Sequence, residues 1–327
     1  MPVSDPDSKQ SRSVSFDHLF ERVLDLYAGD PGAIPVITGP TASGKSKMAM
    51  KLALALGGEI VSVDAMQVYR GFDIGTAKPT REEQLAVPHH MIDCLDACEA
   101  VSVAVFTEQV SDLLEDLVGQ NKKPILCGGS VQYVSALLDG LIFTGVNPDP
   151  KLREKIAARV DRDGLDTSWV RMRELDPQAA SSISPLDRRR IIRFFELVEQ
   201  TGKTKSALNR ASRRAGPRFR YLPFWLDWTP RQVLYQAIDQ RVDTMYRTGL
   251  AKEVADLMTA YPDFEQCPAF RGIGYRQTIA FLQGQISESE AREEVARATR
   301  RYAKRQQTWL RRRKDLYLLL LDRQISE

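Results

Sequence analysis

The sequence contains, at residues 39–46, the stretch Gly39-Pro40-Thr41-Ala42-Ser43-Gly44-Lys45-Ser46. This stretch fits the phosphate-loop pattern G-x-x-x-x-G-K-[ST]. An apolar run at 34–38 precedes it and predicts a strand, and a helical pattern follows at 47–56. In this setting, loop N–H groups and the helix N-terminus can bind phosphate, while Lys45 adds a positive charge. The Ser46 hydroxyl can reach a phosphate-bound Mg²⁺, directly or through water. The loop therefore predicts a phosphate or pyrophosphate site.

Strands and helices alternate in the first part of the chain. Apolar runs predict strands at 34–38, 59–63, 91–93 and 124–127, and helical patterns lie at 47–56, 102–118 and 131–138. Such alternation is typical of a parallel sheet with helices on both faces. We therefore expect an α/β fold with a P-loop NTPase-like parallel sheet and, later in the chain, an all-helical insertion domain.

The pattern changes near residue 148. Residues 148–218 show only helical patterns, at 151–160, 168–175 and 188–200. A strand is expected at 221–227, followed by helices at 230–246, 250–260 and 287–313 and a last strand at 316–321. The expected division is an N-terminal extension (1–33, with disorder in 1–13 and a short helix at 17–27), the first part of the P-loop core (34–147), the helical insertion (148–218), and a return to the core (219–327).

Composition sets limits on the protein's environment. The 327 residues carry a formal net charge of +3. No stretch is long and apolar enough for a membrane span, and the polar N-terminus does not resemble a signal peptide, so we expect a cytoplasmic protein without a membrane partner. The four cysteines do not suggest a disulfide framework. Cys127 and Cys267 are expected to be packing residues, and the spacing of His89, His90, Cys94 and Cys98 matches no common zinc site.

Asp64 follows the predicted second strand. Ligands of open parallel sheets bind at the carboxyl ends of the strands, so this carboxylate should lie near the phosphate loop. It could bind Mg²⁺ or accept a proton from a nucleophile, or it could simply cap local N–H groups. The next loop, 67–79, contains Arg70 and Lys78 and is either an acceptor-binding loop or a connection with solvated charges.

The helix expected at 287–313 has a basic face. On a helical wheel, its apolar face holds Val295, Ala298, Tyr302, Ala303, Trp309 and Leu310. The opposite face holds Arg297, Arg300, Arg301, Lys304, Arg305, Arg311 and Arg312. Phosphate contacts by Lys and Arg dominate affinity for nucleic acid, so this face predicts RNA binding, with a merely solvated face as the alternative.

Further motifs carry a family resemblance. They include Val-Asp-x-Met-Gln-Val-Tyr-Arg-Gly-x-Asp-Ile-Gly-Thr-Ala-Lys-Pro from residue 63, Val-Pro-His-His-x-Ile-Asp from residue 87, Arg-Gly-Ile-Gly-Tyr-Arg at 271–276 and Thr-Arg-Arg-Tyr-Ala-Lys-Arg-Gln at 299–306. With the phosphate loop, this set resembles the bacterial tRNA dimethylallyltransferase (IPP transferase) family over nearly the whole of 34–309.

The resemblance implies a reaction. Members transfer a dimethylallyl group from dimethylallyl diphosphate to N6 of adenosine-37, next to the anticodon of tRNA, and release pyrophosphate. Residues 39–46 would then hold the substrate's diphosphate, with Mg²⁺ as cofactor, and Thr41 would touch substrate. Asp64 would accept the proton, and Arg241 would stabilise the leaving group. Without the family, Arg241 would be assigned a surface ion pair with Asp239 or Asp243.

The resemblance also implies tRNA contacts. Ser130 matches a tRNA-contacting position, and it could also cap the helix at 131–138. We expect a monomer with tRNA and dimethylallyl diphosphate as partners. The full set of expected tRNA-binding residues is Asp64, Ala65, Met66, Gln67, Ser130, Arg153, Arg189, Arg190, Arg193, Arg271, Gly272, Ile273, Gly274, Tyr275, Arg276, Thr299, Arg300, Arg301, Lys304, Arg305 and Gln306.

Some positions depart from the family pattern. Ala65 replaces a usual serine, Phe194 and Phe195 are bulkier than usual, and Gly272 stands where a larger residue is common. These departures concern RNA recognition and leave the chemistry intact. Two other functions remain open: a P-loop kinase acting on a small molecule, and a non-catalytic tRNA-binding relative.

Overall fold

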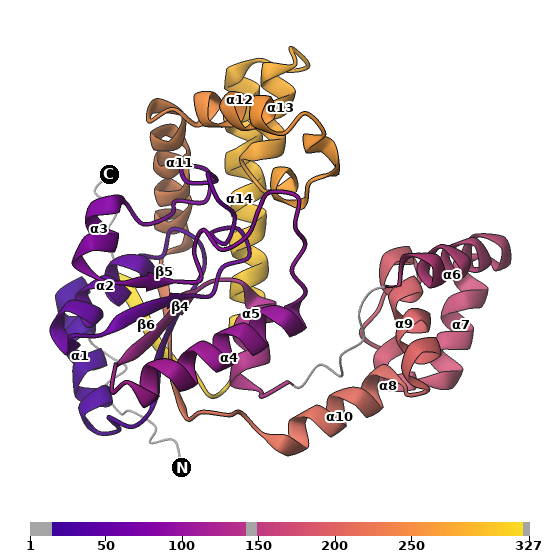
Figure 1. The fold of residues 1–327 in the computed structure, drawn as a ribbon, viewed down its shortest axis with the longest axis horizontal. Helices are drawn as coiled ribbons and strands as arrows, with labels where there is room; N and C mark the ends of the chain where they lie inside the picture. Colours follow the sequence, from indigo (N-terminus) through magenta and orange to yellow (C-terminus); the bar gives the residue numbers. More distant parts are fainter. Residues whose placement is uncertain (1–14, 142–148, 323–327) are drawn as a thin grey trace. The chain divides into compact units, whose positions relative to one another are not determined.

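The computed structural model describes residues 15–141 and 149–322, apart from the side chains of 212–215 (Figure 1). The chain divides into two compact units, one formed by residues up to 134 and from 219 onward, the other by 135–218. The first unit boundary therefore falls inside a helix. The boundary expected at 147 and the disorder expected in 1–13 both lie outside the described residues.

The first unit contains a six-stranded sheet. Its strands are β1 (Ile34–Thr38), β2 (Glu59–Ser62), β3 (His89–His90), β4 (Pro124–Gly128), β5 (Tyr221–Thr229) and β6 (Tyr317–Asp322). Their order is β3-β2-β4-β1-β5-β6, and every neighbouring pair is parallel. The predicted α/β class is thus confirmed, and β1, which leads into the phosphate loop, lies inside the sheet.

Helices cover both faces of this sheet. On one face, α1 (Phe16–Ala28) and α2 (Lys45–Leu56) pack in one apolar cluster with strand residues such as Ile37, Ile125 and Phe224. Alternate strand residues point to the opposite face, where α4 (Val103–Gly119) and α5 (Val131–Leu138) lie (Figure 1). Phe106 and Tyr133 stack there with centroids 4.1 Å apart. The helix predicted at 17–27 is therefore part of the core.

Four helices near the C-terminus pack against one another (Figure 1). They are α11 (Arg231–Arg247), α12 (Leu250–Ala260), α13 (Tyr275–Leu282) and α14 (Glu288–Leu310). Two short 3₁₀ turns, η1 (Phe264–Gln266) and η2 (Pro268–Arg271), join α12 to α13, and α3 (Arg81–Ala86) lies earlier in the chain. A capping box between Ser287 and Glu290 starts α14. Among the described helices, none is long and apolar enough to cross a membrane.

The second unit is helical in its described part. It contains α6 (Pro150–Asp163), α7 (Leu165–Leu175), α8 (Pro177–Ala180), α9 (Arg188–Thr201) and α10 (Lys205–Ala215). Asp149 and Asp176 cap α6 and α8, each directly before a proline, as their sequence pattern indicates. Phe194 and Phe195 are buried in this unit's apolar core. The bulky departures from the family pattern therefore lie inside the unit, away from its surface.

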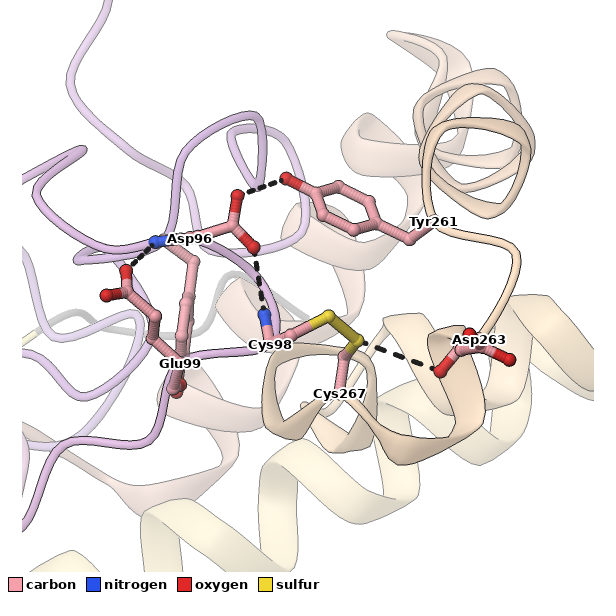
Figure 2. Close-up of a disulfide and its surroundings, with 7 residues drawn as sticks. Asp96, Cys98, Glu99, Tyr261, Asp263 and Cys267 are labelled. Atoms are coloured by element: carbon pink, nitrogen blue, oxygen red, sulfur yellow. Dashed lines mark hydrogen bonds between the residues drawn. A yellow bond between two sulfur atoms is a disulfide. The ribbon is translucent and has the colours of Figure 1, made fainter.

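Two predictions about 91–98 are wrong. The strand expected at 91–93 does not form, because Met91 and Asp93 have left-handed backbones with φ of 59° and 51°; the edge strand consists of His89–His90. No disulfide framework was expected and Cys267 was expected to be a packing residue, but Cys98 forms a disulfide with Cys267 (Figure 2). In the same region, the Tyr261 hydroxyl donates to Asp96 at 2.9 Å. The loop before α4 is therefore tied to the segment between α12 and α13.

Candidate active site

The phosphate loop leaves the end of β1 and is tightly packed. A Cβ atom on Gly39 would lie 2.4 Å from the carbonyl oxygen of Leu226 on β5, so only glycine fits there. Gly44 has a left-handed φ of 89°, after which α2 begins at Lys45. The Trp228 indole donates to the Ala42 carbonyl at 3.2 Å. The loop is thus fixed against β5 as well as by its own turn.

Gln306 lies against this loop from α14. Its Oε1 accepts from the Thr41 N–H at 3.0 Å, and its Nε2 donates to the Gly129 carbonyl at 2.7 Å. The side chain is only 2% exposed. Gln306 was expected among the tRNA contacts; in the structure its buried amide lies between two loops and hydrogen-bonds to both.

Asp64 follows β2 at the carboxyl edge of the sheet. Its Oδ1 accepts from the Met66 N–H at 2.9 Å, so the expected local cap exists. The same side chain also lines a cavity, so the cap does not exclude a role in the site. The Ser130 hydroxyl accepts from the Ala65 N–H at 3.0 Å, which joins this turn to the start of α5.

Arg241 reaches the same region from α11. Its Nη2 donates to the Thr76 carbonyl at 3.4 Å. The surface ion pair considered for it is not formed, because Asp239 pairs with Arg300 and Asp243 pairs with Arg292 at 3.8 Å. Arg241 is instead a cation of the site's interior.

Burial affects the two central cations. It lowers the pKa of Lys45, which Arg241 lowers further and Cys127 and Asp64 partly restore. Burial likewise lowers the pKa of Arg241, and Asp64 opposes this shift. Two half-buried cations therefore interact with each other and with the carboxylate of Asp64.

These side chains border two cavities that share Arg241 as a lining residue. A cavity of about 370 Å³ is lined by residues that include Thr41, Asp64, Ser130, Arg241, Arg271 and Tyr302. A second, of about 310 Å³, is lined by Ser46, Ser62, Gln67 and Cys127. Arg241 lines both. The structure thus brings together phosphate-loop, base and arginine positions that are up to about 200 residues apart in sequence.

The loop after Asp64 is held by polar contacts of Lys78 and Gln67. Lys78 is only 3% exposed and pairs with Asp73 and Asp93 at 2.5 and 2.6 Å. Gln67 donates to the carbonyls of Thr76 and Ala77 at 3.4 and 3.1 Å. Lys78 is therefore a structural cation that fixes the loop and is not a solvated charge. Acceptor binding by the loop stays a prediction.

The segment 271–276 mixes exposed and buried residues. Arg271 and Arg276 are exposed, whereas Gly274 and Tyr275 are buried. A Cβ atom on Gly272 would lie 2.5 Å from Cε of Met66. The glycine that departs from the family pattern thus leaves space that Met66 occupies.

The burial of residues along α14 agrees with the helical-wheel prediction of one apolar and one basic face. Val295, Ala303 and Leu310 are buried, whereas Arg301, Lys304 and Arg305 are exposed. Ion pairs partly neutralise the beginning of the basic face, where Arg297 pairs with Glu294 and Arg300 with Asp239. Within the described residues, Arg301 and Lys304 form no ion pair.

The helical unit presents further arginines. Arg153 and Arg189 are exposed. Arg190 pairs with Asp187 at 3.3 Å, and Arg193 pairs at 2.9 Å with Glu196, which is fully buried. Arg193 therefore neutralises a core carboxylate, whatever else it contacts.

Tyr302 was predicted only as a packing residue, but it also lines the 370 Å³ cavity. Burial, and after it the negative charge of Asp64, raise the pKa of the Tyr302 hydroxyl to about 12. Its hydroxyl therefore stays protonated near neutral pH and can donate a hydrogen bond in the site. Its position inside the motif 299–306 was the available sequence signal.

The site can be tested for a metal. Among the described residues, no three His, Cys, Asp or Glu side chains group as a metal site. Ser46 offers an exposed hydroxyl on the first turn of α2. Mg²⁺ commonly takes one or two protein oxygens and completes its shell with phosphate and water. The residues present fit an ion held mainly by a bound diphosphate.

Fold and site together define a P-loop protein of the α/β class with a carboxylate and a half-buried arginine near the loop. The family model of IPP transferases matches residues 67–313. Two curated relatives, both tRNA dimethylallyltransferases, support this match. The one from Methylococcus capsulatus is 43% identical over 88% of this chain and 92% of its own, and the one from Halothermothrix orenii is 39% identical over 88% and 87%. The chain therefore belongs to the IPP transferase family.

Solved structures agree with this assignment. The tRNA isopentenylpyrophosphate transferase of Bacillus halodurans is 35% identical, with a TM-score of 0.65 over 89% of this chain and 90% of its own. A eukaryotic dimethylallyltransferase acting on tRNA is 27% identical, with a TM-score of 0.75 over 89% and 74%.

Proposed function

We propose that this protein transfers a dimethylallyl group from dimethylallyl diphosphate to N6 of adenosine-37 in tRNA, releasing pyrophosphate. Membership of the IPP transferase family supports the reaction class. The observation that carries the proposal is the charge at the site, where the half-buried side chains of Lys45 and Arg241 lie beside the carboxylate of Asp64. Charges withdrawn even partly from water are costly when they lack enough partners of opposite charge. A diphosphate would supply the missing negative charge.

The arrangement supports a direct displacement, in which the attacking N6 and the departing pyrophosphate are in line with the allylic carbon. The N6 lone pair forms a bond to the allylic carbon while that carbon's bond to oxygen breaks, and pyrophosphate takes the bonding electrons. Asp64 is the proposed acceptor of the N6 proton. Lys45, Arg241 and the loop N–H groups stabilise charge on the leaving oxygens. Thr41, which lines the same cavity, would contact the substrate.

Mg²⁺ is the proposed cofactor. When bound to the diphosphate, it would supply further positive charge to the leaving group. Ser46 is the residue that would hold it, directly or through water. The protein itself contributes the Ser46 hydroxyl, which the first turn of α2 holds in place.

The proposed tRNA-binding surface consists of the exposed basic residues. On the first unit these are Arg271, Arg276, Arg301, Lys304 and Arg305, and on the helical unit Arg153, Arg189 and Arg190. A base must leave its stack to reach a buried site. The cavity that holds Asp64 and Tyr302 is the proposed pocket for the extruded adenine. The expected monomer stays a prediction.

The direct test incubates the protein with dimethylallyl diphosphate, Mg²⁺ and unmodified tRNA, followed by mass spectrometry of the nucleosides. We expect prenylated adenosine. Release of phosphate from ATP with a small-molecule acceptor, and no nucleoside product, would favour the kinase. Binding of tRNA without product would favour the non-catalytic relative.

A further inference from the structure

Glu253 receives four hydrogen bonds on one carboxylate. It lies in the first turn of α12. The N–H groups of Asp73 and Ile74 donate to its Oε2 at 3.2 and 2.7 Å, and the Gly75 N–H donates to its Oε1 at 3.3 Å. The Tyr275 hydroxyl donates to the same Oε1 at 2.7 Å. Three successive backbone N–H groups directed at one anion resemble the nests that bind phosphates, but here the anion belongs to the protein.

The segment held in this way forms a wall of the site. Gly75 and Thr76 line the 370 Å³ cavity, whereas Glu253 itself does not. The Thr76 carbonyl, the next peptide group along, accepts from both Gln67 and Arg241. The position of the Thr76 carbonyl therefore helps to determine where the Arg241 guanidinium lies.

Tyr275 completes the contact from the other side. It is fully buried, and a Cβ atom on Gly75 would lie 2.5 Å from a carbon of its ring. Burial raises the pKa of the Tyr275 hydroxyl, and the charge of Glu253 raises it further. The Tyr275 hydroxyl thus remains a hydrogen-bond donor. Gly75 and Glu253 both pack directly against Tyr275, so the three residues fix one another's positions.

We infer that Glu253 is a positioning residue: by fixing the 73–75 backbone and Tyr275, it places the Thr76 carbonyl and so orients Arg241 toward the diphosphate. The inference rests on the proposed function for the identity of that diphosphate. It predicts an effect on leaving-group stabilisation, which a residue that only supports the fold would not have. A small displacement of a catalytic cation is costly, since about 1 Å of misplacement can reduce rates about 100-fold.

The test compares three variants of the full chain. Glu253→Gln keeps the size but places an NH₂ donor where an acceptor is needed, so at least one N–H loses its partner. Glu253→Asp keeps the charge. Asp256→Asn is the matched control, because Asp256 lies on the same helix in an exposed ion pair with Lys252. The measurements are kcat, the KM for each substrate, and the affinity for inorganic pyrophosphate by calorimetry.

We expect Glu253→Gln to lower kcat about tenfold or more and to weaken pyrophosphate binding, with the KM for tRNA within about twofold of wild type. Glu253→Asp should recover part of the loss, and Asp256→Asn should behave as wild type. If Glu253→Gln fails to fold, Tyr275→Phe, which removes one of the four donors, should give a smaller loss of the same kind.

Two outcomes would overturn the inference: unchanged kcat and pyrophosphate affinity in folded Glu253→Gln, or an equal loss in Asp256→Asn. A wild-type protein that prenylates no tRNA, together with weakened pyrophosphate binding in Glu253→Gln, would reject the proposed function and keep the positioning role. The two ideas can therefore fail separately.

Discussion

Gln306, in the last turns of α14, accepts a hydrogen bond from the backbone N–H of Thr41 with 3.0 Å between nitrogen and Oε1. The same helix carries the exposed basic side chains Arg301, Lys304 and Arg305. A surface proposed for tRNA and a loop proposed for the diphosphate are thus connected by one buried amide. A shift of α14 would move the phosphate loop.

Gln306→Leu tests this connection. The substitution leaves the Thr41 N–H without its acceptor and removes the nearer of two donors to the Gly129 carbonyl, since the Tyr302 hydroxyl also donates to it at 3.5 Å. A buried group left unsatisfied costs about 1–3 kcal/mol. We expect a lower Tm and weaker pyrophosphate binding, measured by thermal denaturation and calorimetry. Thr308→Ala is the control, because its exposed hydroxyl bonds only within α14. Unaltered pyrophosphate binding in Gln306→Leu would show that the amide does not position the loop.

Asp64→Asn tests the proton acceptor. Asparagine can still accept from the Met66 N–H, so the turn should keep its shape, but it cannot take the N6 proton. We expect single-turnover rates to fall about 10²–10⁴-fold while the Kd for tRNA stays close to wild type. Normal turnover in this variant would remove Asp64 as the base.

Lys45 predicts a pH dependence of diphosphate binding. Burial lowers its pKa in the free protein, and a bound anion should raise it again. Between these two pKa values, binding takes up a proton, so affinity for pyrophosphate should fall as the pH rises through the free-protein pKa. Calorimetry over a pH series can measure this. In Lys45→Met the effect should vanish, and titration of pyrophosphate itself is common to both proteins. An identical pH profile in the variant would contradict the prediction.

Arg301→Gln tests the basic face of α14. Arg301 is exposed and, within the described part of the chain, forms no ion pair. If it contacts a phosphate, its loss should weaken tRNA binding and reduce the slope of log K against log salt by about one. The control Lys252→Gln makes the same change of charge on α12. Equal effects in both variants would indicate a general effect of net charge.

The disulfide gives a prediction about thiols. Native protein, denatured without reductant, should expose two alkylatable thiols, Cys94 and Cys127, and four after reduction. Loss of the bond in Cys98→Ser should lower stability by about 2–4 kcal/mol, measured by chemical denaturation. Cys94→Ser, an exposed free cysteine, should have little effect. Four reactive thiols before reduction would refute the bond.

Much of the fold could be predicted from local sequence. β1 and α5 have the predicted bounds, because an apolar run before a phosphate loop and a helical pattern after Gly128-Gly129-Ser130 are unambiguous. The strand expected at 91–93 failed, because an apolar pair says nothing about the left-handed backbone of Met91 and Asp93. Helix α13 was missed because glycines precede it and it has only eight residues.

The candidate site was predictable only where a motif carried it. Family motifs pointed to Lys45, Asp64 and Arg241, and these side chains interact electrostatically in the structure. Glu253 had no sequence signal, since its contacts reach residues about 180 positions away. The pairing of Cys98 with Cys267, 169 positions apart, was hidden for the same reason.

The disulfide between Cys98 and Cys267 also closes a covalent ring in the chain. Cys98 precedes the helical unit and Cys267 follows it, so the whole of 135–218 lies within the ring. A single proteolytic cut anywhere between these cysteines would leave one linked molecule on a non-reducing gel and two fragments after reduction. The helical unit is thus an insertion between two chain segments that the disulfide joins covalently.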